Sequence, residues 1–182
     1  MILRIVLWTL VGIVLGGIVH LVTILYLPRT ATNDAYSRLA QLTKVNAMQP
    51  LPQPTSGSAV MPLMDPAFAT AVCRYDLTTG PLKLSAPVSQ AYTSVSFYTR
   101  YGTAYYAITD RAAGSRVIEL DLMTARQRSQ VPEDEDITAA DRLIVESPTL
   151  TGLIIVRALS PEPSQLGMAQ RAVAGAKCQG AS

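Results

Sequence analysis

The chain has 182 residues, of which 49% are hydrophobic, and its formal net charge is +2 at pH 7. This length fits one ordinary domain plus an appendage, and the hydrophobic fraction is high for a fully soluble protein. The basic residues form neither a stripe nor a run, so the sequence predicts no nucleic-acid partner.

The N-terminal region is an apolar run from Ile5 to Leu27 without Lys, Arg, Asp or Glu. A helix over this run, rising about 1.5 Å per residue, would cross the roughly 30 Å hydrocarbon core of a bilayer. The alternative is a cleaved signal peptide, but its hydrophobic region would be shorter, about 7 to 15 residues. We therefore expect residues 1–27 to be a membrane anchor, with a transmembrane helix at about 5–27 and the lipid bilayer as a partner.

Two features of this run concern partners inside the membrane. Gly12 and Gly16 form a GxxxG pattern, followed by Gly17, and small residues of this kind let helices pack closely. His20, the only histidine, indicates either a proton relay or a neutral side chain that reaches the interface or another helix. These residues predict self-association or a partner membrane protein, as alternatives to an anchor that contacts lipid alone.

The only two cysteines, Cys73 and Cys178, both follow the anchor. An oxidising periplasm would permit a disulfide that joins the beginning of the domain to its end; the alternative is two buried, reduced thiols. Basic residues occur on both sides of the apolar run, so the positive-inside rule alone leaves the orientation undecided. The cysteines favour a single-pass protein of the bacterial inner membrane, with a short cytoplasmic N-terminus and a periplasmic C-terminal domain.

Residues 28–66 are expected to connect the anchor to that domain. Apolar residues at helical spacing predict a juxtamembrane helix over Asn33–Thr43. Repeated prolines in Gln49–Pro66 oppose regular structure and favour an extended spacer. We therefore expect a short helix followed by a proline-rich stalk.

The domain itself is expected over residues 67–182, beginning with a short helix at Phe68–Cys73. Alternating apolar and polar residues then predict several strands, and an alanine-rich segment predicts a helix over Pro163–Cys178. The strands are expected at Leu82–Ala86, Tyr92–Tyr98, Thr103–Thr109, Arg116–Met123, Arg142–Val145 and Gly152–Leu159. The second, third and fourth would form a meander, and the last is apolar enough to be central.

This pattern predicts a mainly β fold. The strands are closely spaced and outnumber the helices, which favours an antiparallel sheet in a sandwich or a partly closed form. The N-terminal transmembrane helix and the C-terminal helix complete the expected architecture.

The predicted hairpin over residues 91–110 holds most of the chain's aromatic side chains. A period of two divides these rings between opposite faces, so cross-strand packing accounts for most of them. The alternative is a pocket or partner surface at the hairpin. The candidate binding surface consists of Tyr92, Tyr98, Arg100, Tyr101 and Tyr106.

The sequence lacks the usual marks of nucleophilic and metal chemistry. No histidine follows the anchor, no serine lies in a G-x-S-x-G pattern and no glycine-rich phosphate loop occurs, so we predict no cofactor and no metal. The acidic run at residues 133–136 precedes Thr138–Asp141, which resembles a capping box. A solvated helix entrance and a calcium site are the alternatives there.

Two segments carry a family resemblance. The pattern D-L-x-x-x-P-x-x-L-x-x-P leads into a tyrosine-containing strand, and R-x-x-x-x-S-P-T precedes a strand with an arginine near its end. The matching residues are Asp76, Leu77, Pro81, Leu84, Pro87, Tyr92, Arg142, Ser147, Pro148, Thr149 and Arg157. Over residues 73 to about 165 the chain resembles the bacterial domain-of-unknown-function family twelve fifty-four, in its small membrane-anchored form.

The resemblance implies a mostly β architecture and no established activity, cofactor or catalytic residue. The chain departs from the long members in lacking their extended N-terminal helical region and second domain. Our leading hypothesis is a binding or assembly module of the bacterial envelope that takes an unknown partner or small ligand. The alternative is a membrane-tethered enzyme that uses Asp76 or Asp110 beside Tyr92 or Tyr106.

Overall fold

A computed structural model describes residues 1–30, 34–114, 116–130 and 143–180. The chain divides into two compact units, Met1–Asp34 and Ala35–Ser182. The folded domain therefore begins at Ala35, well before residue 67, where the sequence pattern had placed its start. The predicted capping box at Thr138–Asp141 and the acidic run before it lie outside the described residues.

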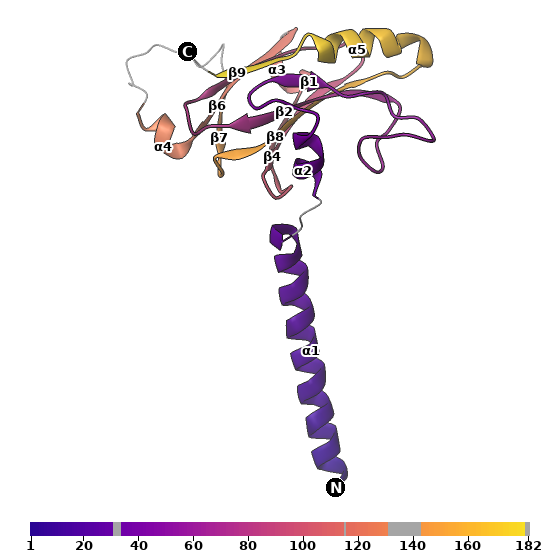
Figure 1. Ribbon diagram of the computed structural model, residues 1–182, viewed down its shortest axis with the longest axis vertical. Helices are drawn as coiled ribbons and strands as arrows, with labels where there is room; N and C mark the ends of the chain where they lie inside the picture. Colours follow the sequence, from indigo (N-terminus) through magenta and orange to yellow (C-terminus); the bar gives the residue numbers. More distant parts are fainter. Residues whose placement is uncertain (31–33, 115, 131–142, 181–182) are drawn as a thin grey trace. The chain divides into compact units, whose positions relative to one another are not determined.

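The first unit is the helix α1, which runs from Ile2 to Thr30 (Figure 1). By length and composition its segment Ile2–Leu27 could cross a membrane. The hydroxyls of Thr9 and Thr23 donate to the carbonyls of Ile5 and Val19, 2.9 and 2.8 Å away. The polar groups of both threonines are thus satisfied within the helix, as an apolar environment requires.

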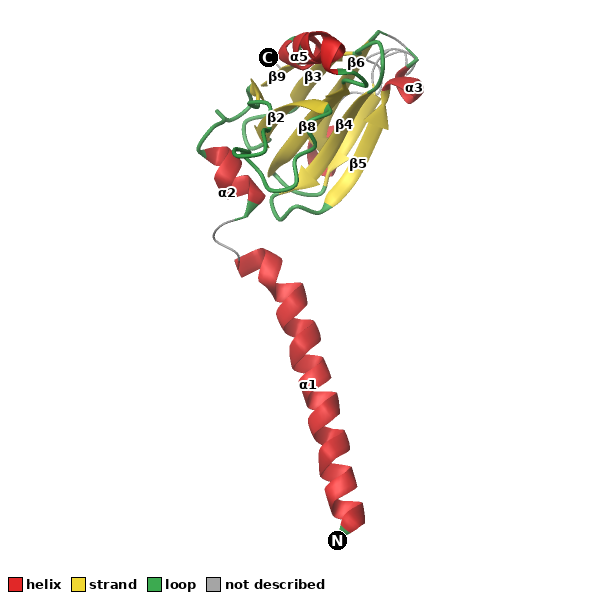
Figure 2. Ribbon diagram, turned by 90° about the vertical axis from the view of Figure 1, so that its right-hand side faces the viewer, coloured by secondary structure: helices red, strands yellow, loops and turns green. Residues whose placement is uncertain are grey.

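The second unit is built on two sheets, which confirms the mainly β prediction (Figures 1 and 2). Neighbouring strands are antiparallel except β6 and β7. In spatial order the five-stranded sheet contains β1 (Met48–Pro50), β2 (Phe68–Asp76), β8 (Thr151–Leu159), β4 (Thr93–Thr99) and β5 (Ala104–Thr109). The four-stranded sheet contains β7 (Leu143–Ser147), β6 (Val117–Thr124), β3 (Leu82–Pro87) and β9 (Lys177–Gly180).

The helices of this unit are short. They are α2 (Ala35–Ala40), α3 (Asp110–Ala113), α4 (Ala125–Arg128), the 3₁₀ turn η1 (Pro163–Gln165) and α5 (Leu166–Ala174). Helix α5 buries Ala169 and Val173 in the main core, which confirms the predicted C-terminal helix. It ends earlier than expected, because the chain then forms β9, where the sequence had suggested more helix up to Cys178.

The main core lies between the two sheets. Strand β4 shows how side chains reach this core. Every second residue of the strand points into it and is buried, namely Thr93, Val95, Phe97 and Thr99, while the residues between them are half-buried. The same period of two operates in β3, where Leu82, Leu84 and Ala86 are buried. The two inner faces together exclude water from one continuous apolar cluster.

Two predictions of local structure are wrong. Phe68–Cys73, expected as a helix, is the first part of β2. The expected meander does not form, because β6 pairs with β3 and β7 in the second sheet and does not pair with β5. The chain leaves β5 through α3, whose C-cap Gly114 has φ 64°, and there it crosses to the other sheet.

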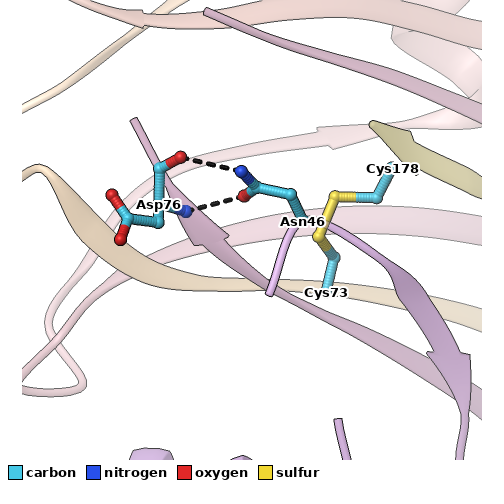
Figure 3. Close-up of a disulfide and its surroundings, with 4 residues drawn as sticks. All are labelled: Asn46, Cys73, Asp76 and Cys178. Carbon is cyan, nitrogen blue, oxygen red and sulfur yellow. Dashed lines mark hydrogen bonds between the residues drawn. A yellow bond between two sulfur atoms is a disulfide. The ribbon is translucent and has the colours of Figure 1, made fainter. Parts of the chain in front are cut away.

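Residues of the expected stalk belong to the domain. Met48 is the register partner of Cys73, and the amide of Leu51 donates to the carbonyl of Thr70 at 2.8 Å. Just before this strand Asn46 has φ 54° and exchanges two hydrogen bonds with the backbone of Asp76, at 2.7 and 2.9 Å (Figure 3). These bonds fix the segment before β1 onto the end of β2.

A disulfide joins Cys73 of β2 to Cys178 of β9, with a Cα–Cα distance of 6.3 Å (Figure 3). The two strands belong to different sheets, and both side chains are buried in the core. The bond therefore connects the two layers of the sandwich directly.

Candidate functional site

The face of the five-stranded sheet that points away from the other sheet is also apolar, and we call it the outer face. It carries Val72, Tyr98, Leu153 and Ile155, from three adjacent strands. Because side chains alternate along a strand, the neighbours of these residues face the main core. Strands β2 and β8 are thus apolar on both faces, and something must cover the second one.

The cover comes from residues before β2. Leu39 of α2 is 2% exposed, and Leu51, Val60 and Met61 pack against the same cluster. The cover is incomplete. Between it and the sheet lies a cavity of about 440 Å³, which we call the outer-face cavity. This volume is within the range of about 300–1,000 Å³ that is typical of small-molecule sites.

The lining of the outer-face cavity is predominantly apolar, with a few polar groups. The apolar side chains include Leu39, Leu51, Met61, Met64, Phe68, Val72, Leu153 and Ile155. Tyr98 contributes an aromatic ring, and Asp65, Thr70 and Arg157 contribute polar groups. The two methionines are unbranched and adapt readily to the shape of an apolar partner.

The floor of the cavity follows β8. Across the β2 ladder Arg157 pairs with Thr70, Ile155 with Val72 and Leu153 with Arg74. At about 3.3 Å per residue, the floor from Arg157 to Leu153 is about 13 Å long. The cavity is therefore elongated along the strand, and its floor changes from a cationic end to an apolar one.

The roof is the segment from Met61 to Asp65. Leu63 at its tip is fully exposed and has φ 61°, a backbone conformation that leucine rarely adopts. A carboxylate oxygen of Asp65 accepts the amide of Ala67 at 2.8 Å, which closes the turn before β2. Backbone strain of this kind is concentrated at ligand-binding and switch segments.

Helix α2 forms one wall and is held by a cation–π arrangement. The guanidinium of Arg100 lies 4.1 Å from the ring centroid of Tyr36, and that of Arg74 lies 5.7 Å from it. Arg74 also donates to the carbonyl of Thr43 at 3.3 Å. The two arginines come from β2 and from the hairpin turn, so they join α2 to the sheet at the apolar end of the cavity.

The predicted aromatic surface is not one site. Tyr98 lines the cavity, Arg100 contacts Tyr36 of α2, and Tyr101 is exposed at the tip of the turn. Tyr106 packs against the main core, on the opposite face of the sheet from Tyr98. Tyr92 is half-buried just before β4 and is not a lining residue. The cavity, in contrast, does not follow from the sequence pattern, because its roof, Met61–Asp65, lies within the segment that the prolines predict to be a stalk.

A bulge changes the expected alternation in β5. Tyr106 is the register partner of Phe97, while Ala104 is that of Tyr98, so Tyr105 is the extra residue. Both tyrosine rings therefore contact Phe97, with centroids 6.1 and 5.8 Å away. The period of two had placed these two tyrosines on opposite faces, and the bulge puts both on the core side.

The bulge brings Tyr105 into a hydroxyl network inside the sandwich. The phenol of Tyr75, which is completely buried, lies 3.2 Å from that of Tyr105, 3.0 Å from the Ser147 hydroxyl and 3.3 Å from that of Thr149. Burial is the main reason why the pKa of Tyr105 is raised well above its usual value. Ser147 and Thr149, two of the residues that carry the family resemblance, thus satisfy a polar group of the core.

The carboxylates of the enzyme hypothesis stabilise turns. Asp76 accepts from the hydroxyl and the amide of Thr78 at 2.7 and 2.9 Å, and these bonds, the hydroxyl first, lower its pKa. Asp110 accepts the amide of Thr93 at 3.4 Å. Neither residue lines the cavity. Among the described residues no three His, Cys, Asp or Glu side chains are grouped so that they could hold a metal ion.

The candidate packing residues of the anchor all lie on exposed parts of α1. A Cβ added at Gly12, Gly16 or Gly17 would have no neighbour within 4 Å, so each position is open to a partner helix. His20 belongs to the same exposed surface. Their role in helix packing stays a prediction.

A second concavity, of about 620 Å³, lies beside the turn after β2. Its lining includes Thr78, Gly80, Thr124 and Arg126, and Gln127 donates to the carbonyl of Leu77 at 2.8 Å. It is more open and less apolar than the outer-face cavity. Ligand sites are typically enclosed and apolar, so the outer-face cavity is the stronger candidate.

A family model described as "Protein of unknown function (DUF1254)" matches residues 43–180. Among solved structures, the VPA0106 protein from Vibrio parahaemolyticus is similar with a TM-score of 0.59 and 12% identity, over 80% of this chain and 32% of that chain. An uncharacterised protein from Burkholderia cenocepacia is similar with a TM-score of 0.45 and 14% identity, over 65% and 33%. No curated protein matches the chain. The chain thus spans about a third of the length of these solved proteins, and the likeness to the first extends to the fold alone.

Proposed function

We propose that this chain, which belongs to the DUF1254 family of proteins of unknown function, is a membrane-anchored binding module for an apolar ligand. The observation that carries the proposal is the outer-face cavity, an apolar space of about 440 Å³ on the second face of an already buried sheet. An apolar ligand in this cavity would gain dispersion contacts with its lining.

The position of the cavity in the chain supports a ligand drawn from the bilayer. Ala35, a lining residue, is separated from the end of α1 at Thr30 by residues 31–34 alone. Even fully extended, this connection spans at most about 18 Å. If α1 crosses the bacterial inner membrane, with the domain on the periplasmic side, lipid chains are the apolar molecules at highest local concentration.

The arrangement of polar groups favours binding over catalysis. An enzyme site would bring a general acid or base into contact with the substrate space. Among the described residues the cavity is lined by a single carboxylate, that of Asp65, which closes a backbone turn, and by a single phenol, that of Tyr98. The other candidates, Asp76 and Asp110, are engaged elsewhere.

Photo-crosslinking tests the proposal with the full chain in phosphatidylcholine nanodiscs. An uncharged alkyl chain that carries a diazirine should label peptides of the cavity, such as Met61–Asp65, in the wild type. Ile155→Trp should abolish this labelling, because the larger side chain fills the floor of the cavity. Glu119→Trp, at an exposed position of β6, is the matched control and should leave labelling unchanged. Equal labelling of the cavity in Ile155→Trp and wild type, or none in either, would contradict the proposal.

A further inference from the structure

The cationic end of the cavity floor is the exposed guanidinium of Arg157. Arg157 belongs to β8, the strand between β2 and β4, and its side chain points to the outer face together with Ile155 and Leu153. Its guanidinium makes no hydrogen bond or ion pair with any residue that the structure describes. Arginine carries five donors and stays charged at any relevant pH, so this site presents a permanent cation to whatever enters the cavity.

The surroundings of Arg157 differ from the rest of the floor. Its register partners are Thr70 in β2 and Ser94 in β4, so hydroxyl-bearing residues flank it on both neighbouring strands. Two residues along β8 the floor is apolar, with Ile155 between Val72 and Ser96. The cavity therefore has a polar, cationic end and an elongated apolar remainder. This arrangement is complementary to a molecule with one polar head group and one apolar chain.

We propose that the ligand of the outer-face cavity is a long-chain carboxylate, whose head group binds Arg157 and whose chain lies along Ile155 and Leu153. This inference rests on the proposed function and adds the chemical class of the ligand. A planar guanidinium matches a carboxylate in a bidentate geometry, and the hydroxyl of Thr70 is a further donor beside it. The floor of about 13 Å offers one extended chain an apolar strip to lie along.

Asp65 is the one acidic residue that lines the cavity in the part of the chain that the structure describes, and its charge opposes a carboxylate. One of its oxygens already accepts the Ala67 amide, which gives Asp65 a structural role in the roof. If the ligand is anionic, Asp65→Asn should retain or tighten binding. If the head group were cationic, the same substitution would weaken binding, so this variant reports the sign of the ligand's charge.

The test uses the full chain in phosphatidylcholine nanodiscs and two diazirine probes with the same chain, palmitic acid and its methyl ester, at a pH where the acid is ionised. In the wild type the acid should label the cavity peptides about tenfold more than the ester at equal concentration in the bilayer. This is the gain in affinity expected from one partly exposed, charge-assisted hydrogen bond between the carboxylate and Arg157. Arg157→Ala should remove this preference and Arg157→Lys should retain part of it. Arg171→Ala, at an exposed position of α5 outside the cavity, is the control and should leave the preference intact.

Equal labelling by acid and ester in the wild type would overturn the inference and leave the proposed function standing. An acid preference that survives Arg157→Ala would also overturn it, because the head group would then bind elsewhere. Failure of both probes to label the cavity would contradict the proposed function and the inference together.

Discussion

The phenolic oxygen of Tyr75 lies 3.0 Å from the hydroxyl of Ser147, at the centre of a hydroxyl network between the two sheets. Tyr75 comes from the five-stranded sheet and Ser147 from the end of β7 in the other one. A polar group that is completely buried must be hydrogen-bonded to be tolerated. The network therefore fixes how the two layers meet at this end of the sandwich.

Tyr75→Phe should lower the free energy of unfolding by about 1–3 kcal/mol, because it removes the hydroxyl that the other members share. Urea unfolding of the full chain in detergent measures this loss. A double-mutant cycle with Ser147→Ala should give a coupling of at least about 0.5 kcal/mol. Tyr101→Phe, at an exposed tyrosine, is the control. Additive effects of the two core substitutions would show that the hydroxyls do not act together.

Gly152→Ala should be strongly destabilising, because a Cβ at this position would overlap the carbonyl oxygen of Tyr98 and the phenol of Tyr75. Overpacking of this kind costs about 1–3 kcal/mol, and here one obstacle is backbone that cannot rotate away. Gly180→Ala has open space around it and should change stability by less than about 0.5 kcal/mol. Similar unfolding curves for the two variants would refute the close approach at Gly152.

The stability of the domain should fall as the pH rises above about 10. Burial raises the pKa of Tyr105 in the folded chain, whereas in the unfolded chain the phenol has its usual pKa of 10.0. Above that pH the unfolded state binds fewer protons, so alkali favours unfolding. The slope should be less than about 1.4 kcal/mol per pH unit, because Tyr105 is partly exposed. Urea midpoints at pH 9 and pH 11 should differ less in Tyr105→Phe than in the wild type.

Reduction of the Cys73–Cys178 disulfide should destabilise the domain by about 4 kcal/mol. The bond closes a loop with a sequence separation of 105, and loops of this length lose much conformational entropy in the unfolded chain. The comparison is between oxidised and reduced full chain in denaturant, with Cys73→Ala/Cys178→Ala as the variant that should match the reduced protein. Insensitivity of the wild-type midpoint to reductant would contradict a structural role for the bond.

Asn46 should tolerate glycine better than alanine. Its positive φ strains any residue with a Cβ, and its side chain makes two hydrogen bonds to the backbone of Asp76. Asn46→Ala should lose the bonds and retain strain, at a cost of about 2 kcal/mol, while Asn46→Gly loses only the bonds. Differential scanning calorimetry of the two variants separates the loss of the hydrogen bonds from the backbone strain. A lower melting temperature for the glycine variant than for the alanine variant would argue against strain.

Much of the fold follows from local patterns. Alternation in β3 and β4 predicts strands because each has one face in the core and a second face that is half-buried. Strand β2 lacks this alternation, since Ala71, Val72 and Cys73 are buried in succession and lie on both faces of the sheet. A short apolar run without alternation is compatible with a helix and with a strand. Here the tertiary pairing with β8 makes the segment a strand.

The sequence predicts less of the outer-face cavity than of the fold. The cavity joins Leu39 of α2, Met61 of the roof and Ile155 of β8, which are remote in the chain. Pro62 in the roof and the prolines before it indicate irregular backbone, which is correct, but they do not indicate whether that backbone packs on a sheet. The useful signal was the set of apolar residues in that segment, such as Met61, Leu63 and Met64, which a solvated stalk would not require.

Native mass spectrometry of the full chain, released from nanodiscs made with a bacterial lipid extract, tests the central claim that the outer-face cavity holds an apolar ligand. We expect the wild type and Glu119→Trp to retain one adduct with the mass of a single-chain lipid, and Ile155→Trp to lose it while its thermal unfolding stays cooperative. A folded Ile155→Trp protein that retains the same adduct, or a wild type that never carries one, would contradict the claim.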